Sequence, residues 1–378
     1  MTAVRSINFL LLLILISCKQ NAINNNEKAI IGDWKFIKEI QKKGGHAAPE
    51  PQLIEFVGGY SFLSDGVCEK KPGYFKRIKG NEPQDGKTLF LGTTTKYKIE
   101  DDSLKIYNLY SCTWTSLKIA SINIDTMILR NNDSNFVKYA KSNYQIDDKE
   151  HFDKIIISAS GCYGACPIND ISINEKGEAI YFGDEYNTVN GCFKSKLSPT
   201  IFSKLENDFK KANIKKLRDH YSGMWSDDET ISVTFVKSNK VFKTVVDYGR
   251  QSPAEFYWAY TSARYLYQQI PLDTISIHLN YFPFKYSLFE SGGKVCELSQ
   301  SEGFYLWTLL MASNKTNKHF TEKYFIRNVR LKEREIKTDG QLFKFTDDDG
   351  VTRTYDLGFN FIITNGFDKK FRIKNQYD

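Results

Sequence analysis

The sequence predicts a mainly β protein with α+β elements: an antiparallel barrel, then an α+β sandwich domain, then a β-rich C-terminal section. The first part of the chain is a series of short strand-like runs separated by turn residues, the middle alternates hairpins with two amphipathic helices, and the end returns to hairpins. With 378 residues, 41% hydrophobic and 14% aromatic, the chain is long enough for two or three domains and too apolar to be disordered.

The N-terminus has the pattern of an export signal. Arg5 supplies a positive charge, Phe9 to Ile16 is an unbroken apolar run, and the small Ser17 precedes Cys18. The apolar run is too short to span a bilayer. This arrangement resembles the lipobox of bacterial lipoproteins. The resemblance implies that residues 1–17 are a signal peptide and that Cys18 is lipidated.

A lipid on Cys18 implies a protein of the bacterial cell envelope with the membrane as its first partner. By the same resemblance, Lys19 rather than an aspartate after the cysteine favours sorting to the outer membrane over retention in the inner membrane. Residues 18–28 lack apolar periodicity and are expected to be a tether. The net charge of +7 is mild, and the basic runs at 210–218 and 369–374 are expected to be solvated faces. Nucleic acid is not expected as a partner.

The first domain is expected over residues 29–141. Gly32-Asp33-Trp34 opens a strand, and further short strands are expected at 53–57, 96–100, 104–109, 116–119, 126–129 and 136–139. The Gly-x-Trp motif with these hairpins resembles the lipocalin-like domains of bacterial surface lipoproteins. The resemblance implies that Trp34 packs at the closed end of the barrel and that the other end admits a small apolar ligand.

The second domain is expected over residues 150–271. Ile155 to Ile157 predicts a buried strand, and two hairpins alternate with two helices. The first helix is expected to follow Ser198, with Pro199 in its first turn. The second is expected to begin at Ser252, where Ser252 and Glu255 match a capping box.

Residues 152–271 also carry a specific motif, Cys-x-Gly-x-Cys-Pro, as Cys162 to Pro167. With Gly177, Asp219, Tyr221, the Asp227 region and Asp247-Tyr248, this segment resembles a bacterial family called domain of unknown function 6438. Ile168-Asn169-Asp170 departs from the aliphatic-aromatic pair common in that family. The resemblance implies an architecture and no activity.

Cys162 and Cys166 are close enough in sequence for a disulfide, which is the default fate of exported thiols. A thiol-redox pair remains an alternative, as does a metal site completed by Cys192 and His220. In the barrel Cys68 and Cys112 are expected to pair with each other. Cys192 and Cys296 are left, with their connectivity open.

Catalytic patterns are sparse, and neither a catalytic residue nor a cofactor or resident metal is predicted. No Gly-x-Ser-x-Gly elbow or phosphate-binding glycine loop occurs. The histidines, which lack ligand spacing, are His46, His151, His220, His278 and His319. The best polar cluster combines Asp219-His220 with residues 225–229, and it is more typical of a solvated acidic loop than of an acid-base site.

The C-terminal section, residues 272–378, is expected to be β-rich. A hairpin turns at Ser291 to Gly293, and Phe304 to Met311 is apolar on every side, as in a buried helix. Residues 347–350 lack the ligand pattern of a calcium loop and predict a hairpin turn.

The sequence therefore favours a lipid-anchored, non-enzymatic binding or interaction protein. Its ligand is open among a small apolar molecule, a peptide and a glycan. The alternative is a periplasmic thiol-redox or metal-binding factor centred on Cys162 and Cys166. A purely structural envelope protein is the third hypothesis.

Overall fold

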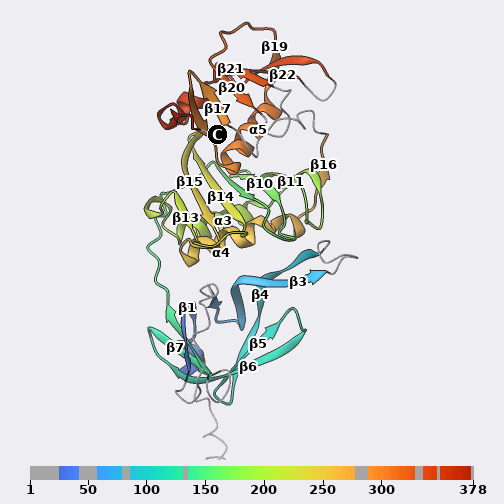
Figure 1. Ribbon diagram of the computed structural model, residues 1–378. Helices are drawn as coiled ribbons and strands as arrows, with labels where there is room; N and C mark the ends of the chain where they lie inside the picture. The colour runs from blue at the N-terminus through green and yellow to red at the C-terminus, as the bar shows by residue number, and fades with distance from the viewer. Residues whose placement is uncertain are drawn as a thin grey trace, which may run out of the picture. The chain divides into compact units, whose positions relative to one another are not determined.

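The computed structural model describes residues 25–41, 58–78, 86–130, 135–276, 288–327, 335–346 and 350–375 (Figure 1). Cys18, the expected strand at 53–57 and Asp347 to Asp349 lie outside these ranges, as do His46 and His278. The chain forms two compact units, the first from Met1–Lys71 and Thr93–Asn143, the second from Pro72–Gly92 and Tyr144–Asp378. None of the helices within the described ranges has the length and apolar character needed to cross a membrane.

A closed antiparallel barrel of eight strands confirms the fold predicted for the N-terminal region. Its strands are β1 (Gly32–Gln41), β2 (Gly59–Phe62), β3 (Val67–Ile78), β4 (Lys87–Glu100), β5 (Ser103–Asn108), β6 (Thr113–Ile122), β7 (Thr126–Arg130) and β8 (Asn135–Lys141). Closure comes from the pairing of β1 with β8, where Trp34 lies opposite Lys141. Full closure leaves this sheet without a free edge.

Trp34 is a packing residue of the barrel interior. It is wholly buried, and its indole N–H donates to the Ile30 carbonyl at 2.6 Å, just after the short helix α2 (Asn25–Ala29). Gly32 precedes it with φ of +120°, and a Cβ there would lie 2.8 Å from the Lys141 side chain. A side chain at position 32 would therefore be strained in its backbone and crowded by Lys141.

The bridge expected between Cys68 and Cys112 is absent, and this prediction was wrong. Both thiols are free, Cys68 buried and Cys112 exposed. Cys68 lies on β3 with its side chain in the barrel core, whereas Cys112 ends the turn between β5 and β6. Burial raises the pKa of the Cys68 thiol to about 12, which keeps it protonated and unreactive.

The second unit contains an eight-stranded sheet in the order β13-β15-β14-β9-β10-β11-β12-β16. Its strands are β9 (Lys154–Ala159), β10 (Asn169–Asn174), β11 (Glu178–Gly183), β12 (Gly191–Lys196), β13 (His220–Ser222), β14 (Thr230–Lys237), β15 (Lys240–Tyr248) and β16 (Asp273–Thr274). We call it the central sheet. All pairings are antiparallel except that of β13 with β15.

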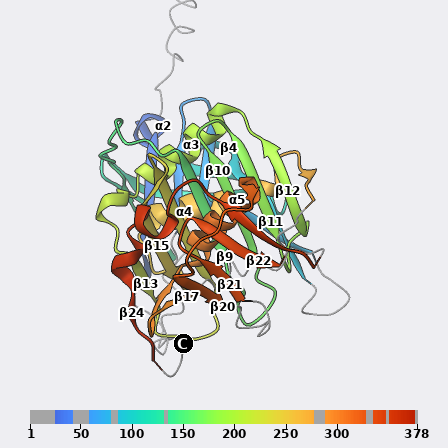
Figure 2. The same ribbon diagram turned by 90° about the horizontal axis from the view of Figure 1, so that it is seen from above.

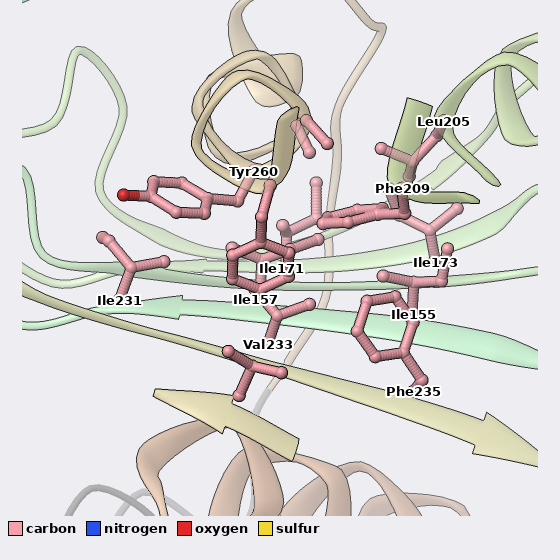
Figure 3. Close-up of a cluster of buried hydrophobic side chains, with 14 of the residues drawn as sticks. Ile155, Ile157, Ile171, Ile173, Leu205, Phe209, Ile231, Val233, Phe235 and Tyr260 are labelled. Carbon is pink, nitrogen blue, oxygen red and sulfur yellow. The ribbon is translucent and has the colours of Figure 1, made fainter. Parts of the chain in front are cut away.

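Helices α3 (Pro199–Lys210) and α4 (Ala254–Arg264) cover one face of the central sheet, and the short helices η3 (Ile214–Lys216) and η4 (Leu266–Gln268) follow them. In Figure 3, Ile155 and Ile157 of β9 point toward Phe209 of α3 and Tyr260 of α4. The predicted start of α3 is confirmed. The capping box predicted at Ser252 is wrong: α4 begins at Ala254, and the Ser252 hydroxyl donates to Asp247 instead.

The basic run at 210–218 was expected to be a solvated face, and this is wrong for Lys210 at the end of α3. It is 4% exposed and forms a 3.0 Å ion pair with Glu206, which is buried as well. Glu206 also accepts the backbone N–H of Phe152 at 2.8 Å. The pair is therefore hydrogen-bonded as well as charged, which is how a buried ion pair is tolerated.

Helix α5 (Gln300–Ala312) covers the opposite face of the central sheet and confirms the buried helix expected there. Its N-terminus is a complete capping box: Ser299 accepts from the Glu302 N–H and Glu302 accepts from the Ser299 N–H. The sequence carries this Ser-x-x-Glu pattern at Ser299 and Glu302, whereas the helix was predicted from its apolar run alone. The Ile155 to Ile157 run is buried throughout because Ile156 packs on the α5 side.

A third sheet, in the order β19-β23-β22-β21-β20-β17-β18-β24, shares a core with α5. Its strands are β17 (Leu288–Ser291), β18 (Lys294–Glu297), β19 (Asn314–Thr316), β20 (Tyr324–Arg327), β21 (Glu335–Thr338), β22 (Leu342–Thr346), β23 (Thr352–Asp356) and β24 (Arg372–Ile373), with α6 (Phe361–Thr364) and η6 (Phe367–Lys370). Figure 2 gives a second view of these layers. The boundary expected near residue 271 therefore falls inside one compact unit.

Candidate functional site

The disulfide predicted between Cys162 and Cys166 is present, with 5.6 Å between the Cα atoms. It closes a short loop directly after β9. Gly164 within the loop has φ of +140°, in the region that favours glycine. Tyr163 points away from the protein with 89% of its surface exposed. The bridge thus shapes a loop that presents an aromatic side chain to solvent.

Two neighbouring loops are fixed to this one by backbone hydrogen bonds. Ile168 exchanges bonds with Asp184 and Glu185, both at 2.9 Å, and the Tyr163 N–H donates to the Asp227 carbonyl at 3.1 Å. We call the three segments, residues 160–168, 184–190 and 223–229, the disulfide tip. It unites parts of the chain that are far apart in the sequence.

A buried asparagine pair secures the base of the tip. Asn187 and Asn169 are both wholly buried, and the Asn169 amide donates to Asn187 Oδ1 at 2.8 Å. Asn187 donates in turn to the carbonyls of Ile168 and Glu185. Asn169 lies 18 residues before Asn187, and no local sequence pattern links the two.

Two arginines hold two of the acidic residues of the tip. Arg250 pairs with Asp228 at 3.2 Å, and Arg264 pairs with Glu229 at 2.8 Å. Burial raises the pKa of Asp228, but hydrogen bonds from Glu229 and Trp225, with the Arg250 charge, lower it overall. The cluster predicted at 225–229 is therefore divided: Asp228 and Glu229 serve the structure, while Asp227 is exposed.

Asp247 has a structural role rather than a place in the tip. It is wholly buried and accepts from the N–H groups of Gln251 and Ser252 and from the Tyr260 hydroxyl at 2.9 Å. These bonds fix the turn between β15 and α4. Burial raises the pKa of Tyr260 well above its usual value, so its hydroxyl remains a donor to this carboxylate.

A groove of about 990 Å³ adjoins the tip, within the second unit. Its floor includes Thr230, Ser232 and Thr244 of the central sheet, and the first turn of α5 lies along it. The base of the disulfide loop contributes Ser160 and Gly161. Charged residues on its walls are Asp184, Glu185, Asp219, Lys243, Glu297, Glu302 and Lys370.

The groove has an acidic excess that is partly neutralised. Lys243 pairs with Asp219, and this hydrogen bond lowers the pKa of the Asp219 carboxyl. Glu302, 3% exposed, accepts from the Thr244 hydroxyl at 2.8 Å. Glu185 and Glu297 are exposed at the walls. His220, predicted beside Asp219 in a polar cluster, also lines the groove and is exposed.

Polar side chains join α5 to the central sheet beside the groove, and we call this contact the polar seam. The Ser301 N–H donates to Ser232 Oγ at 3.0 Å, and the hydroxyls of Thr234 and Ser301 are 2.8 Å apart. Gln300 donates to Asp170 at 2.9 Å. The sequence shows the alternation of polar and apolar residues in β14. It does not indicate that the polar side faces α5.

The metal alternative is not supported by the arrangement of its proposed ligands. Cys162 and Cys166 are joined to each other, Cys192 is buried on β12, and His220 lies on β13. Five strands of the central sheet separate β13 from β12. Within the described ranges, no three His, Cys, Asp or Glu residues are grouped so as to hold a metal ion.

Comparison with known proteins finds a family similarity for one region of this chain. Residues 153–267 match the family model described as Domain of unknown function (DUF6438). The match runs from β9 to η4 and includes all three loops of the disulfide tip. No protein with a curated description matches the chain.

Proposed function

We propose that this protein is a lipid-anchored bacterial envelope protein whose second unit is a non-enzymatic binding module. The observation that carries the proposal is the groove beside the disulfide tip, about 990 Å³ in volume. Ligand sites in proteins are usually preformed, have volumes of about 300–1,000 Å³ and contain a few positioned polar groups that orient the ligand. Thr230, Ser232 and Thr244 supply such groups from a rigid sheet.

The anchor is proposed from the sequence. Arg5, the apolar run and Cys18 support export and lipidation, and the outer membrane is the proposed location. Replacement of Cys18 by serine should release the protein from the membrane fraction and abolish incorporation of labelled palmitate.

The closed barrel with its buried Trp34 supports the likeness to lipocalin-like domains. We include in the proposal a small apolar ligand bound by the barrel.

The groove is tested by filling it. Thr230→Trp places a large side chain in the groove. The matched control is Thr274→Trp, on the edge strand β16, which lies away from the groove. The full-length protein in detergent is screened against lipids, peptides and glycans by native mass spectrometry and thermal shift. We expect binding that the groove variant weakens by at least about tenfold while the control retains it.

Two results would contradict the proposal. One is no binding by the wild type to any of the three ligand classes. The other is a ligand whose affinity for Thr230→Trp equals that for the wild type. Circular dichroism must show the same melting curve for Thr230→Trp and Thr274→Trp, so that loss of binding reflects the filled groove.

A further inference from the structure

The disulfide tip carries exposed apolar side chains of the types that dominate protein interfaces. Tyr163 is 89% exposed, Met224 is fully exposed and Trp225 is 40% exposed. They lie on two loops joined by the hydrogen bond from Tyr163 to Asp227. Tyr, Trp and Met are enriched at interfaces relative to the rest of protein surfaces.

The tip is held in place before any partner binds. The disulfide closes the Tyr163 loop, and Trp225 donates from its indole N–H to Asp228 at 3.2 Å. The indole also lies against Gly223 and Gly249, where an added Cβ would approach it to 2.8 and 2.9 Å. A rigid surface loses less conformational entropy on binding than a flexible loop does.

The charge of the tip is opposite to that of the whole chain. The chain has a net charge of +7, but the three tip segments contain no lysine or arginine. Their acidic residues are Asp184, Glu185, Asp227, Asp228 and Glu229. Asp228 and Glu229 are paired with arginines from outside the tip, while the side chains of Glu185 and Asp227 are exposed.

We propose that the disulfide tip is a docking surface for a basic polypeptide segment of a partner protein. Lysine or arginine side chains would lie over the faces of Tyr163 and Trp225 and pair with Glu185 and Asp227. Charge complementarity selects this occupant, because a neutral glycan offers no cation and an anionic one is repelled. The inference rests on the proposed binding function and names a partner class for the surface beside the groove.

The test uses fluorescein-labelled arginine-rich, lysine-rich and glutamate-rich peptides of equal length with the full-length protein in detergent. One variant combines Tyr163→Ser with Met224→Ser, and a second combines Glu185→Gln with Asp227→Asn. Asparagine suits position 227, where φ is +72°. The controls, on exposed residues of the same unit outside the tip, are Ile373→Ser and Asp273→Asn.

We expect both basic peptides to bind, with about tenfold weaker affinity for each tip variant, and unchanged affinity for the controls. Affinity should fall as salt rises, because the contacts are exposed. Equal binding of the glutamate-rich peptide, or equal affinity of wild type and tip variants, would overturn the proposal. Tyr163-dependent binding of a neutral glycan instead would do the same and assign the surface to carbohydrate.

The two proposals fail in different ways. If the groove ligand still binds and is blocked by Thr230→Trp while the basic peptides do not bind, only the docking surface is refuted. If the peptides bind through the tip and no ligand binds in the groove, the groove is refuted as a binding site and the docking-surface proposal stands. If nothing binds at either place, both proposals are wrong.

Discussion

The two faces of the central sheet are made by neighbouring residues of the same strands, yet their chemistry differs. On β14, Val233 points into the mainly apolar core under α3 and α4, while the next residue, Thr234, meets Ser301 of α5. The first face holds its helices mainly by burial, which is non-directional, with a few hydrogen bonds such as that from Tyr260 to Asp247. The second face adds directional hydrogen bonds between the sheet and the first turn of α5, and these fix where α5 begins.

The difference shows how a covering helix can leave a groove open. Bonds to Ser232, Thr234 and Asp170 hold the first turn of α5 on the sheet. The sheet beyond that turn carries polar side chains that tolerate solvent, so it can line a groove. An apolar sheet surface at this place would have favoured further packing against it, which would close the groove.

The largest expected effect is on the apolar face. Phe209 is wholly buried and packs edge to face on Phe235 at 5.1 Å. Phe209→Ala should lower the free energy of unfolding by about 4 kcal/mol, because it leaves a cavity that the sheet cannot collapse to fill. Urea unfolding followed by circular dichroism measures it. A loss below about 1 kcal/mol would mean that this core is loosely packed.

The disulfide is expected to matter less. Cys162→Ser with Cys166→Ser should lower the free energy of unfolding by about 2 kcal/mol, since the closed loop is short. Basic-peptide affinity should fall as well, because Tyr163 loses its fixed position. If the double variant instead lost an oxidoreductase activity that the wild type shows in an insulin-reduction assay, the thiol-redox alternative would replace the binding proposal.

A reciprocal exchange on β14 sharpens the comparison of the two faces. Val233→Thr places a hydroxyl in the apolar core and should cost about 2 kcal/mol. Thr234→Val keeps the shape but leaves Ser301 without its 2.8 Å partner and should cost about 1 kcal/mol. Both are read from urea midpoints. Equal costs would show that the faces do not differ in the way that their contacts indicate.

The smallest effect is a pH dependence at the groove wall. The hydrogen bond from Lys243 lowers the folded-state pKa of Asp219 below its unfolded value of about 3.9. The stabilisation is therefore complete above about pH 4 and is lost as the pH falls through the folded pKa. Because the Asp219 side chain is 69% exposed, we expect a few tenths of a kcal/mol. Asp219→Asn should remove this contribution in acid titrations of stability, whereas Asp273→Asn should not.

Much of the fold was predictable because it depends on residues close in sequence. Short strand-like runs between turn residues predicted most of the barrel strands, although β2 and β3 were not among them. Pro199 marked the start of α3, and an apolar run predicted α5. The spacing of Cys162 and Cys166 made their disulfide the leading expectation. Ser252 shows the limit of local patterns, since its hydroxyl is taken by Asp247 rather than by the helix that it precedes.

The sequence by itself indicated most of the barrel strands, the start of α3 and the buried helix α5, and it favoured the short disulfide, because each of these depends on neighbouring residues. Tertiary structure alone decided that Cys68 and Cys112 stay apart, that Asn187 meets Asn169 and that Arg250 and Arg264 engage two of the tip carboxylates. It also decided the polar seam, where Ser301 meets Ser232 from 69 residues away. Such contacts depend on how the elements pack, and local propensity carries no information about which distant polar groups will become partners.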